Sequence, residues 1–298
     1  MEFLVDDVHD GVLLRSFLKG TCGVSSRLLI QLKKRENGIT VNGEHATVRR
    51  RLCAGDRVVI SEKDVVPQDA FTPVSLPFSI LYEDEALLVV DKPPGMPTHP
   101  SAGHDGDTLA NALTWYFARR GEPFVFRPVS RLDRDTSGIL TLAKNQYVAS
   151  KLCEAMQAHR ICKTYFAFTD GLPPEEAGRI ETGTRRREDF FVLREVCPVD
   201  AAGASLTVTE YRVAETFGAY ALLEVHPLTG RTHQIRVHLA HLGCPILGDD
   251  LYGRASPLVS RQALHAARLE LSHPLTGEAL VFTSPLPPDL EVLRYHKR

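Results

Sequence analysis

The segment RLDRDTSG (residues 131–138) and the apolar run ILTLA (residues 139–143) after it are the most informative part of the chain. The first five residues hold two carboxylates and two guanidiniums. The Thr-Ser-Gly that follows is typical of a turn, and the apolar run predicts a buried strand. Neighbouring arginines favour the ionised form of an aspartate. Asp133 is therefore a candidate nucleophile or base, although Arg–Asp clusters also occur on ordinary surface turns.

Basic residues are concentrated near the N-terminus. Residues 11–61 hold ten Lys and Arg but three Asp and Glu, a net charge of +7, whereas the whole chain carries −2. This asymmetry indicates a polyanionic partner that the small basic segment contacts. A solvated basic face is the alternative. Six of the basic residues form two clusters that we expect to bind phosphates: Lys33, Lys34, Arg35, Arg49, Arg50 and Arg51.

The same segment has a clear pattern of elements. Apolar spacing predicts helices over 11–19 and 27–35, the second capped by Ser25-Ser26. Strands are expected at 39–41 and 57–60, with an Asn-Gly turn after the first. Two helices followed by GITVNG, a basic run and a GDRVVI strand resemble the alpha-L RNA-binding domain. The resemblance covers residues 11–66 and implies RNA as the partner, because charge alone indicates only a polyanion.

The remainder of the chain is expected to form a linker and a larger domain. Residues 67–77 contain three prolines and no periodicity, which predicts a linker. Residues 78–298 mix strands and helices without regular βαβ alternation. We therefore expect an α+β fold: a catalytic domain on a largely antiparallel, mixed sheet, preceded by a small α/β RNA-binding domain. The helices of the catalytic domain are predicted at 108–119 and 148–158. Its strands are predicted within 80–95 and at 139–143, 163–168, 205–213 and 219–226.

A second polar cluster, HPLTGRTHQIRVHL, occupies residues 226–239. Thr232 is the expected N-cap of a helix over 233–242 that buries Ile235, with Arg231 just before its first turn. Histidines are frequent here, but the nearby arginines oppose a cation and no carboxylate lies among them, so no metal site is predicted.

Several long motifs occur in one order: ILYEDEALLVVDKPPG, RLDRDTSG, KTYFA, HPLTGRTHQIRVHLAHLGCPILGDDLYG and LHAARLELSHPLTG. Together they resemble the RluA-type pseudouridine synthases, and the basic segment matches the subset that carries an alpha-L domain. Many members have His where this chain has Ser130. The resemblance implies isomerisation of specific uridines to pseudouridine in structured RNA, most readily large-subunit ribosomal RNA, with transfer RNA as the alternative.

The resemblance also implies roles for single residues. Asp133 would attack the ring or sugar, or take the sugar proton, and Arg231 would keep Asp133 ionised. Tyr165 would stack on the base and remove the proton from ring carbon five, although the residues alone favour a core tyrosine on an alternating strand. Arg131 would enter the RNA helix where the uridine is flipped out, and Ile235 would line the pocket.

Other functions are less compatible with these residues. A non-catalytic RNA-binding or ribosome assembly factor would need only the basic segment. A glycoside hydrolase would need two separated carboxylates, which Asp133 and Asp135 do not provide. Without a Gly-rich phosphate loop or a Cys-x-x-Cys pair, we expect no cofactor, nucleotide or metal. The chain is expected to be a cytoplasmic monomer with no membrane segment.

Overall fold

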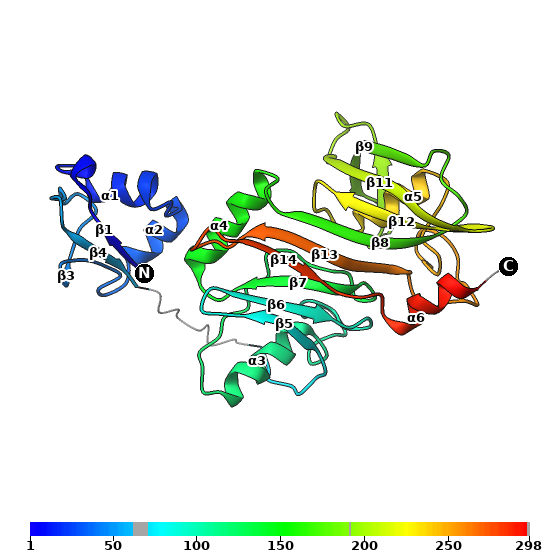
Figure 1. Cartoon of the computed structure of the whole chain (residues 1–298), viewed down its shortest axis with the longest axis horizontal. Helices are drawn as coiled ribbons and strands as arrows, with labels where there is room; N and C mark the ends of the chain where they lie inside the picture. The colour runs from blue at the N-terminus through cyan, green and yellow to red at the C-terminus, as the bar shows by residue number, and fades with distance from the viewer. Residues whose placement is uncertain (62–70, 191, 297–298) are drawn as a thin grey trace.

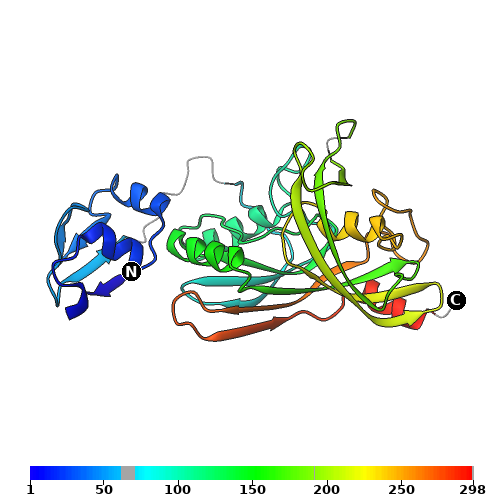
Figure 2. The ribbon, with the colours of Figure 1, turned by 90° about the horizontal axis from the view of Figure 1, so that it is seen from above.

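Two separate sheets organise the chain (Figures 1 and 2). The computed structural model describes residues 1–61, 71–190 and 192–296. The predicted linker therefore lies partly outside the described residues, as do residues 62–66 of the predicted N-terminal domain. Within the described part, no helix has the length and apolar character needed to cross a membrane.

The N-terminal module is a four-stranded sheet with short helices. The strands pair antiparallel in the order β1-β4-β2-β3, so residues before position 11 belong to the module as well. The predicted first helix is a single α-turn followed by a wider π-type turn. Ser25 caps α2 by accepting a hydrogen bond from the Leu28 N–H. The elements are β1 (Glu2–Leu4), η1 (Asp7–His9), α1 (Leu14–Ser16), η2 (Phe17–Thr21), α2 (Ser26–Leu32), β2 (Ile39–Val41), β3 (Glu44–His45) and β4 (Arg57–Ile60).

The larger body is built on a ten-stranded sheet in the order β10-β9-β11-β12-β8-β13-β7-β6-β5, with β14 paired to β13. Among the described residues, these strands all pair antiparallel except β7 and β13, which are parallel. This confirms the predicted α+β fold with a largely antiparallel, mixed sheet. The strands are β5 (Ser79–Glu83), β6 (Leu87–Lys92), β7 (Ser137–Ala143), β8 (Cys162–Asp170), β9 (Ala177–Arg186), β10 (Arg194–Cys197), β11 (Ser205–Phe217), β12 (Tyr220–Pro227), β13 (Leu264–Ser272) and β14 (Ala279–Thr283). The helices are α3 (Leu109–Arg119), α4 (Gln146–Gln157), α5 (Gln234–His241), α6 (Pro288–Glu291) and η3 (Val292–Tyr295).

The strand predicted after the Thr-Ser-Gly turn is β7, and all of its residues are buried. Both faces of the sheet are covered here. Leu88 and Val90 of β6 belong to the core that contains α3, whereas Leu87 and Val89 belong to the core that contains α4. Alternate residues of a strand point to opposite faces, so the apolar run reflects burial on both sides.

Gly138 joins the Asp133 loop to the centre of the sheet. Its φ is +109°, and a Cβ built there would lie 2.3 Å from the Ala266 carbonyl oxygen. Only glycine permits this close parallel approach of β7 to β13. Ala266 pairs on its other side with Tyr165 of β8. The glycine of the motif therefore brings the Asp133 loop and Tyr165 to the same part of the sheet.

The module contacts the larger body through α4. The Tyr147 hydroxyl donates a 2.5 Å hydrogen bond to the Cys22 carbonyl oxygen, and its ring centroid lies 6.1 Å from that of Phe3. Tyr147 packs among the buried residues of the module's own core. Figure 1 shows α4 at the end of the body that faces the module.

Candidate active site

The loop that carries Asp133 is held by hydrogen bonds to its backbone. The Thr98 hydroxyl donates to the Leu132 carbonyl (2.8 Å), and the buried Lys92 ammonium donates to the Arg134 carbonyl (2.9 Å). Lys92 also donates to two carbonyls of its own segment, at 2.7 and 2.8 Å. Burial lowers the pKa of Lys92 to about 7, against the attraction of Asp135 and Asp133. The loop is anchored on both sides of Asp133, which restricts the positions its carboxylate can take.

The cation that contacts Asp133 is Arg236. Its Nη1 lies 3.3 Å from Asp133 Oδ2, while Nε and Nη2 each donate a 2.7 Å hydrogen bond to Asp249. Burial opposes the charge of Arg236, but the hydrogen bonds and charge of Asp249, together with Asp133, outweigh it and raise the pKa of Arg236. Asp249 is fully buried and also accepts from the N–H groups of Leu251 and Tyr252. Asp249 therefore positions Arg236, and Arg236 faces Asp133.

Arg231 does not take the position that its motif led us to expect. It is exposed, and it forms no ion pair with any residue in the described parts of the chain. It lines the cleft from the loop between β12 and α5. In the free protein Asp133 pairs with Arg236 of α5, and Arg231, the cation that the motif suggested, is not its partner. The sequence did not single out Arg236, because it predicted burial of Ile235 on one face of the helix, whereas every residue from Gln234 to Leu239 is buried.

The start of α5 is irregular. Its N-cap is His233, not Thr232, and His233 has a left-handed backbone with φ +56°. Its Nε2 lies 3.9 Å from Asp133 Oδ1, and its Nδ1 is 3.0 Å from the Tyr252 hydroxyl. Burial, helped by the nearby Arg236, lowers the pKa of His233 despite Asp133. A strained non-glycine residue beside a carboxylate is typical of a functional site. Sequence patterns did not single out His233.

Arg131 links the two loops that border the cleft. Its Nη2 donates a 2.5 Å hydrogen bond to the Thr232 hydroxyl, although the two residues are 101 positions apart. The side chain is exposed. Asp135 forms a surface pair with the neighbouring Arg134 at 2.9 Å. Arg131 is thus oriented across the mouth of the cleft.

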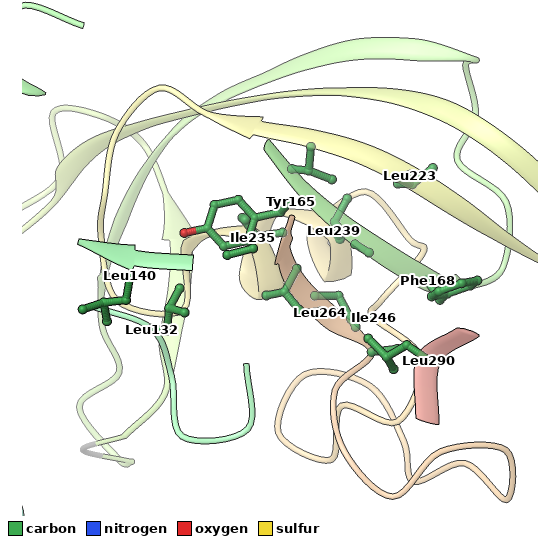
Figure 3. Packing of buried hydrophobic residues seen from close by; sticks show 14 of the residues in the cluster. Leu132, Leu140, Tyr165, Phe168, Leu223, Ile235, Leu239, Ile246, Leu264 and Leu290 are labelled. Atoms are coloured by element: carbon green, nitrogen blue, oxygen red, sulfur yellow. The ribbon is translucent and has the colours of Figure 1, made fainter. Parts of the chain in front are cut away.

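Tyr165 and Ile235 form an apolar side of the cleft. Tyr165 is 8% exposed and Ile235 is 6% exposed. Figure 3 shows both beside Leu132, at the edge of the main core. Burial, and then the charge of Asp133, raise the pKa of Tyr165. The Tyr165 phenol is therefore protonated in the free protein.

These residues surround one cavity of about 340 Å³. Asp133, Tyr165, Arg231, Ile235 and Arg236 all line it, and so does Arg131. His99 and Lys163, which the sequence did not single out, line it as well. The volume is in the range of small-molecule and nucleobase sites. In the described part of the chain, no three His, Cys, Asp or Glu side chains gather as metal ligands.

The two basic clusters lie apart from this cavity. All six side chains are exposed or half-buried on the module, and none lines the cleft. Arg35 lines a small cavity between the module and α4. Arg51 donates a 2.8 Å hydrogen bond to the Gly11 carbonyl, and Arg50 lies 4.0 Å from Glu44. The clusters and the cleft are therefore two separate surfaces.

Known proteins match this chain over both halves of the cleft. A family model described as RNA pseudouridylate synthase matches residues 86–241. Ribosomal large subunit pseudouridine synthase D of Pseudomonas aeruginosa is 37% identical over 269 residues, which cover 86% of this chain and 82% of that protein. The uncharacterized RNA pseudouridine synthase YjbO of Bacillus subtilis is 35% identical over 274 residues, which cover 92% of this chain and 95% of that protein. The solved structure of Human RNA Pseudouridylate Synthase Domain Containing 4 matches with a TM-score of 0.58 and 28% identity, over 72% of this chain and 93% of that one.

Proposed function

The chain belongs to the RluA-type family of RNA pseudouridine synthases, and on this premise we propose that it modifies specific uridines of large-subunit ribosomal RNA with Asp133 as nucleophile. The enzyme is an isomerase that acts on RNA. Support for ribosomal RNA comes from relatives named ribosomal large subunit pseudouridine synthase D, including those of Pseudomonas aeruginosa and Vibrio cholerae. Support for Asp133 comes from its position in the cleft beside the buried pair of Arg236 and Asp249.

We assign to Arg236 the role that the sequence motif suggested for Arg231. When a flipped-out uridine fills the cavity and excludes water, an aspartate without a cation would take up a proton and lose its reactivity. Arg236 is fixed by Asp249 before the substrate arrives, so little reorganisation is needed during reaction. His233 closes the other side of the carboxylate and is neutral at pH 7, because the pKa of this buried imidazole is lowered.

Tyr165 is proposed to stack on the uracil ring and then to remove the proton from carbon five. Stacking needs only the neutral phenol, which the raised pKa of Tyr165 provides. The base role needs a phenolate. One cause of the raised pKa of Tyr165 is the charge of Asp133, and that charge disappears when the carboxylate forms a bond to the substrate. Loss of that charge would lower the pKa of Tyr165 and ease release of the phenolic proton to solvent, which leaves the phenolate that takes the proton from carbon five.

The remaining residues are proposed to hold the RNA. Arg131, oriented by Thr232 at the mouth of the cavity, would take the space that the flipped uridine leaves. The alpha-L-like module would bind structured RNA through its two basic clusters, away from the reacting base. Ile235 would form the apolar wall on which the uracil rests.

A direct test uses protein-free large-subunit ribosomal RNA from a strain that lacks this enzyme. The RNA is incubated with purified protein, and pseudouridine is mapped by carbodiimide adducts. We expect adducts at discrete uridines with the wild-type protein and none with Asp133→Asn. Transfer RNA from the same strain is assayed in parallel. Modification of transfer RNA alone would overturn the ribosomal assignment, and release of free uracil would overturn the isomerase mechanism.

A further inference from the structure

A second, larger cavity continues from the active-site cleft. Its volume is about 650 Å³, and it lies between the turn that links α4 to β8 and the loop that follows β12. The two cavities share six lining residues: Met156, Lys163, Pro227, Thr229, Gly230 and Arg231. They therefore adjoin each other, and the shared residues form the junction between them. A uracil ring in the first cavity leaves the second one empty.

Two cationic side chains, Lys163 and Arg231, line both cavities. Lys163 is partly buried, and the one contact of its ammonium within the described residues is with the Met156 sulfur at 3.5 Å. Arg231 is exposed and also has no carboxylate partner there. Burial lowers the pKa of Lys163 to about 8, which is the expected effect of an unpaired ammonium away from water. An anion placed between these side chains would compensate both charges.

The surroundings favour an anion over a cation. Glu210 is the one carboxylate that lines the second cavity among the described residues, and Arg179 already donates to it at 2.9 Å. The floor is apolar, with Met156, Ile161 and Leu228 among the lining side chains. An apolar floor beside two cations fits a planar base attached to a phosphate.

We propose that the second cavity binds the nucleotide next to the target uridine, and that Lys163 and Arg231 bind the phosphate joining the two. The proposal rests on the action of this enzyme on RNA and adds to it a second subsite. The flipped uridine and its neighbour would lie in adjacent cavities, with the shared phosphate at the junction. The sequence motif led us to expect Arg231 as the partner of Asp133. In this proposal Arg231 positions the RNA instead.

The first test separates binding from chemistry. Lys163→Met keeps the length and apolar stem of the side chain and removes the charge, Lys163→Arg restores the charge, and Arg231→Gln removes the second cation. We expect KM for the RNA to rise on the order of tenfold in Lys163→Met and Arg231→Gln, with kcat within about twofold. Lys163→Arg should recover most of the affinity. The salt dependence of binding should flatten by about 0.7 to 1 unit of log–log slope for each cation removed.

The matched control is Arg160→Gln. Arg160 is an exposed cation three residues from Lys163, and it lines neither cavity. This variant should leave KM and the salt slope at wild-type values. Unchanged KM in both Lys163→Met and Arg231→Gln would overturn the proposal, as would a fall in kcat at constant KM.

A second test needs no substitution. Cys162 is exposed and lines the second cavity, whereas Cys153 is exposed on α4 and lines neither cavity. Bound RNA should slow maleimide labelling of Cys162 while Cys153 reacts at its free rate. Equal labelling of Cys162 with and without saturating RNA would show that the second cavity stays empty.

Both tests use whichever of the two RNAs, ribosomal or transfer, the wild-type enzyme modifies. Activity on transfer RNA alone would overturn the ribosomal assignment. The subsite would then be tested by the same measurements with transfer RNA. An enzyme active on ribosomal RNA, with unaltered KM in the variants, would remove only the subsite.

Discussion

Arg236 joins two carboxylates of different exposure, Asp133 and Asp249. The Asp133 side chain is 21% exposed, whereas that of Asp249 is 0% exposed. Asp249 uses both of its oxygens on the guanidinium, which leaves a single Nη1 contact for Asp133. The buried carboxylate therefore serves as the fixed partner of Arg236. The half-buried Asp133 receives Arg236 at Oδ2, and the nearest ring nitrogen to its Oδ1 is His233 Nε2 at 3.9 Å, beyond hydrogen-bond distance.

Asp133→Asn should abolish turnover while RNA affinity stays within a few-fold of wild type. An amide is similar in size and cannot act as a carboxylate nucleophile, and Arg236 keeps its main partner in Asp249. Pseudouridine formation under single-turnover conditions and RNA binding by filter retention measure the two quantities. A variant with a normal rate would rule out Asp133 as the nucleophile.

Arg236→Lys should lower kcat on the order of 100-fold. A lysine keeps the charge but cannot bind Asp249 through two parallel hydrogen bonds and also reach Asp133. Steady-state kinetics measure this effect, and Arg268→Lys, an exposed arginine on β13, is the control. The thermal midpoint should also fall, because Asp249 loses part of its compensation in a buried position. An equal reduction of kcat in Arg231→Lys would contradict the assignment of the catalytic cation to Arg236.

Replacing Arg49, Arg50 and Arg51 by Gln should weaken RNA binding and flatten its salt dependence, by about 0.7 to 1 unit of slope for each phosphate that is no longer bound. These side chains lie outside the cleft, so kcat at saturating RNA should be retained. Binding titrations at several salt concentrations provide the slope. An unaltered slope would mean that this cluster does not bind RNA.

Acid should destabilise the protein through His238. This side chain is fully buried, and its two ring nitrogens lie 2.9 Å from the hydroxyls of Thr207 and Thr209. Burial, and then the charge of His241, lower the pKa of His238 to about 4. The unfolded chain binds this proton at a higher pH than the folded one. The stabilisation is therefore complete above the unfolded pKa of about 6.5 and is lost as pH falls towards 4.

For this one histidine the expected loss of stability between pH 7.5 and pH 5 is about 2 kcal/mol. Urea unfolding at the two pH values measures it. His238→Gln keeps hydrogen-bonding capacity without a titrating group, so its stability should depend less on pH by that amount. An identical pH dependence of stability in the variant and the wild type would contradict the lowered pKa of His238.

Local chemistry was sufficient for much of the architecture. The run after Gly138 was predicted as a buried strand because it is short, largely apolar and preceded by a turn. Ser25 caps α2, as its side-chain oxygen before the apolar stripe predicted. Asp133 stood out because its charged neighbours and the following turn are adjacent in sequence. Features whose causes lie within a few residues could be inferred without coordinates.

The partner of Asp133 could not be inferred in this way. Arg231 and Arg236 belong to one motif, and their difference arises only when α5 packs against β10, β11 and β12 and buries Arg236 beside Asp249. The left-handed His233, the anchoring of the loop by Lys92 and the second cavity likewise join segments far apart in the chain. The sequence by itself determined which residue types are available and the strands and helices that carry them. Only the tertiary structure decided which charges lose their water and must find a partner, because burial depends on the packing of distant elements.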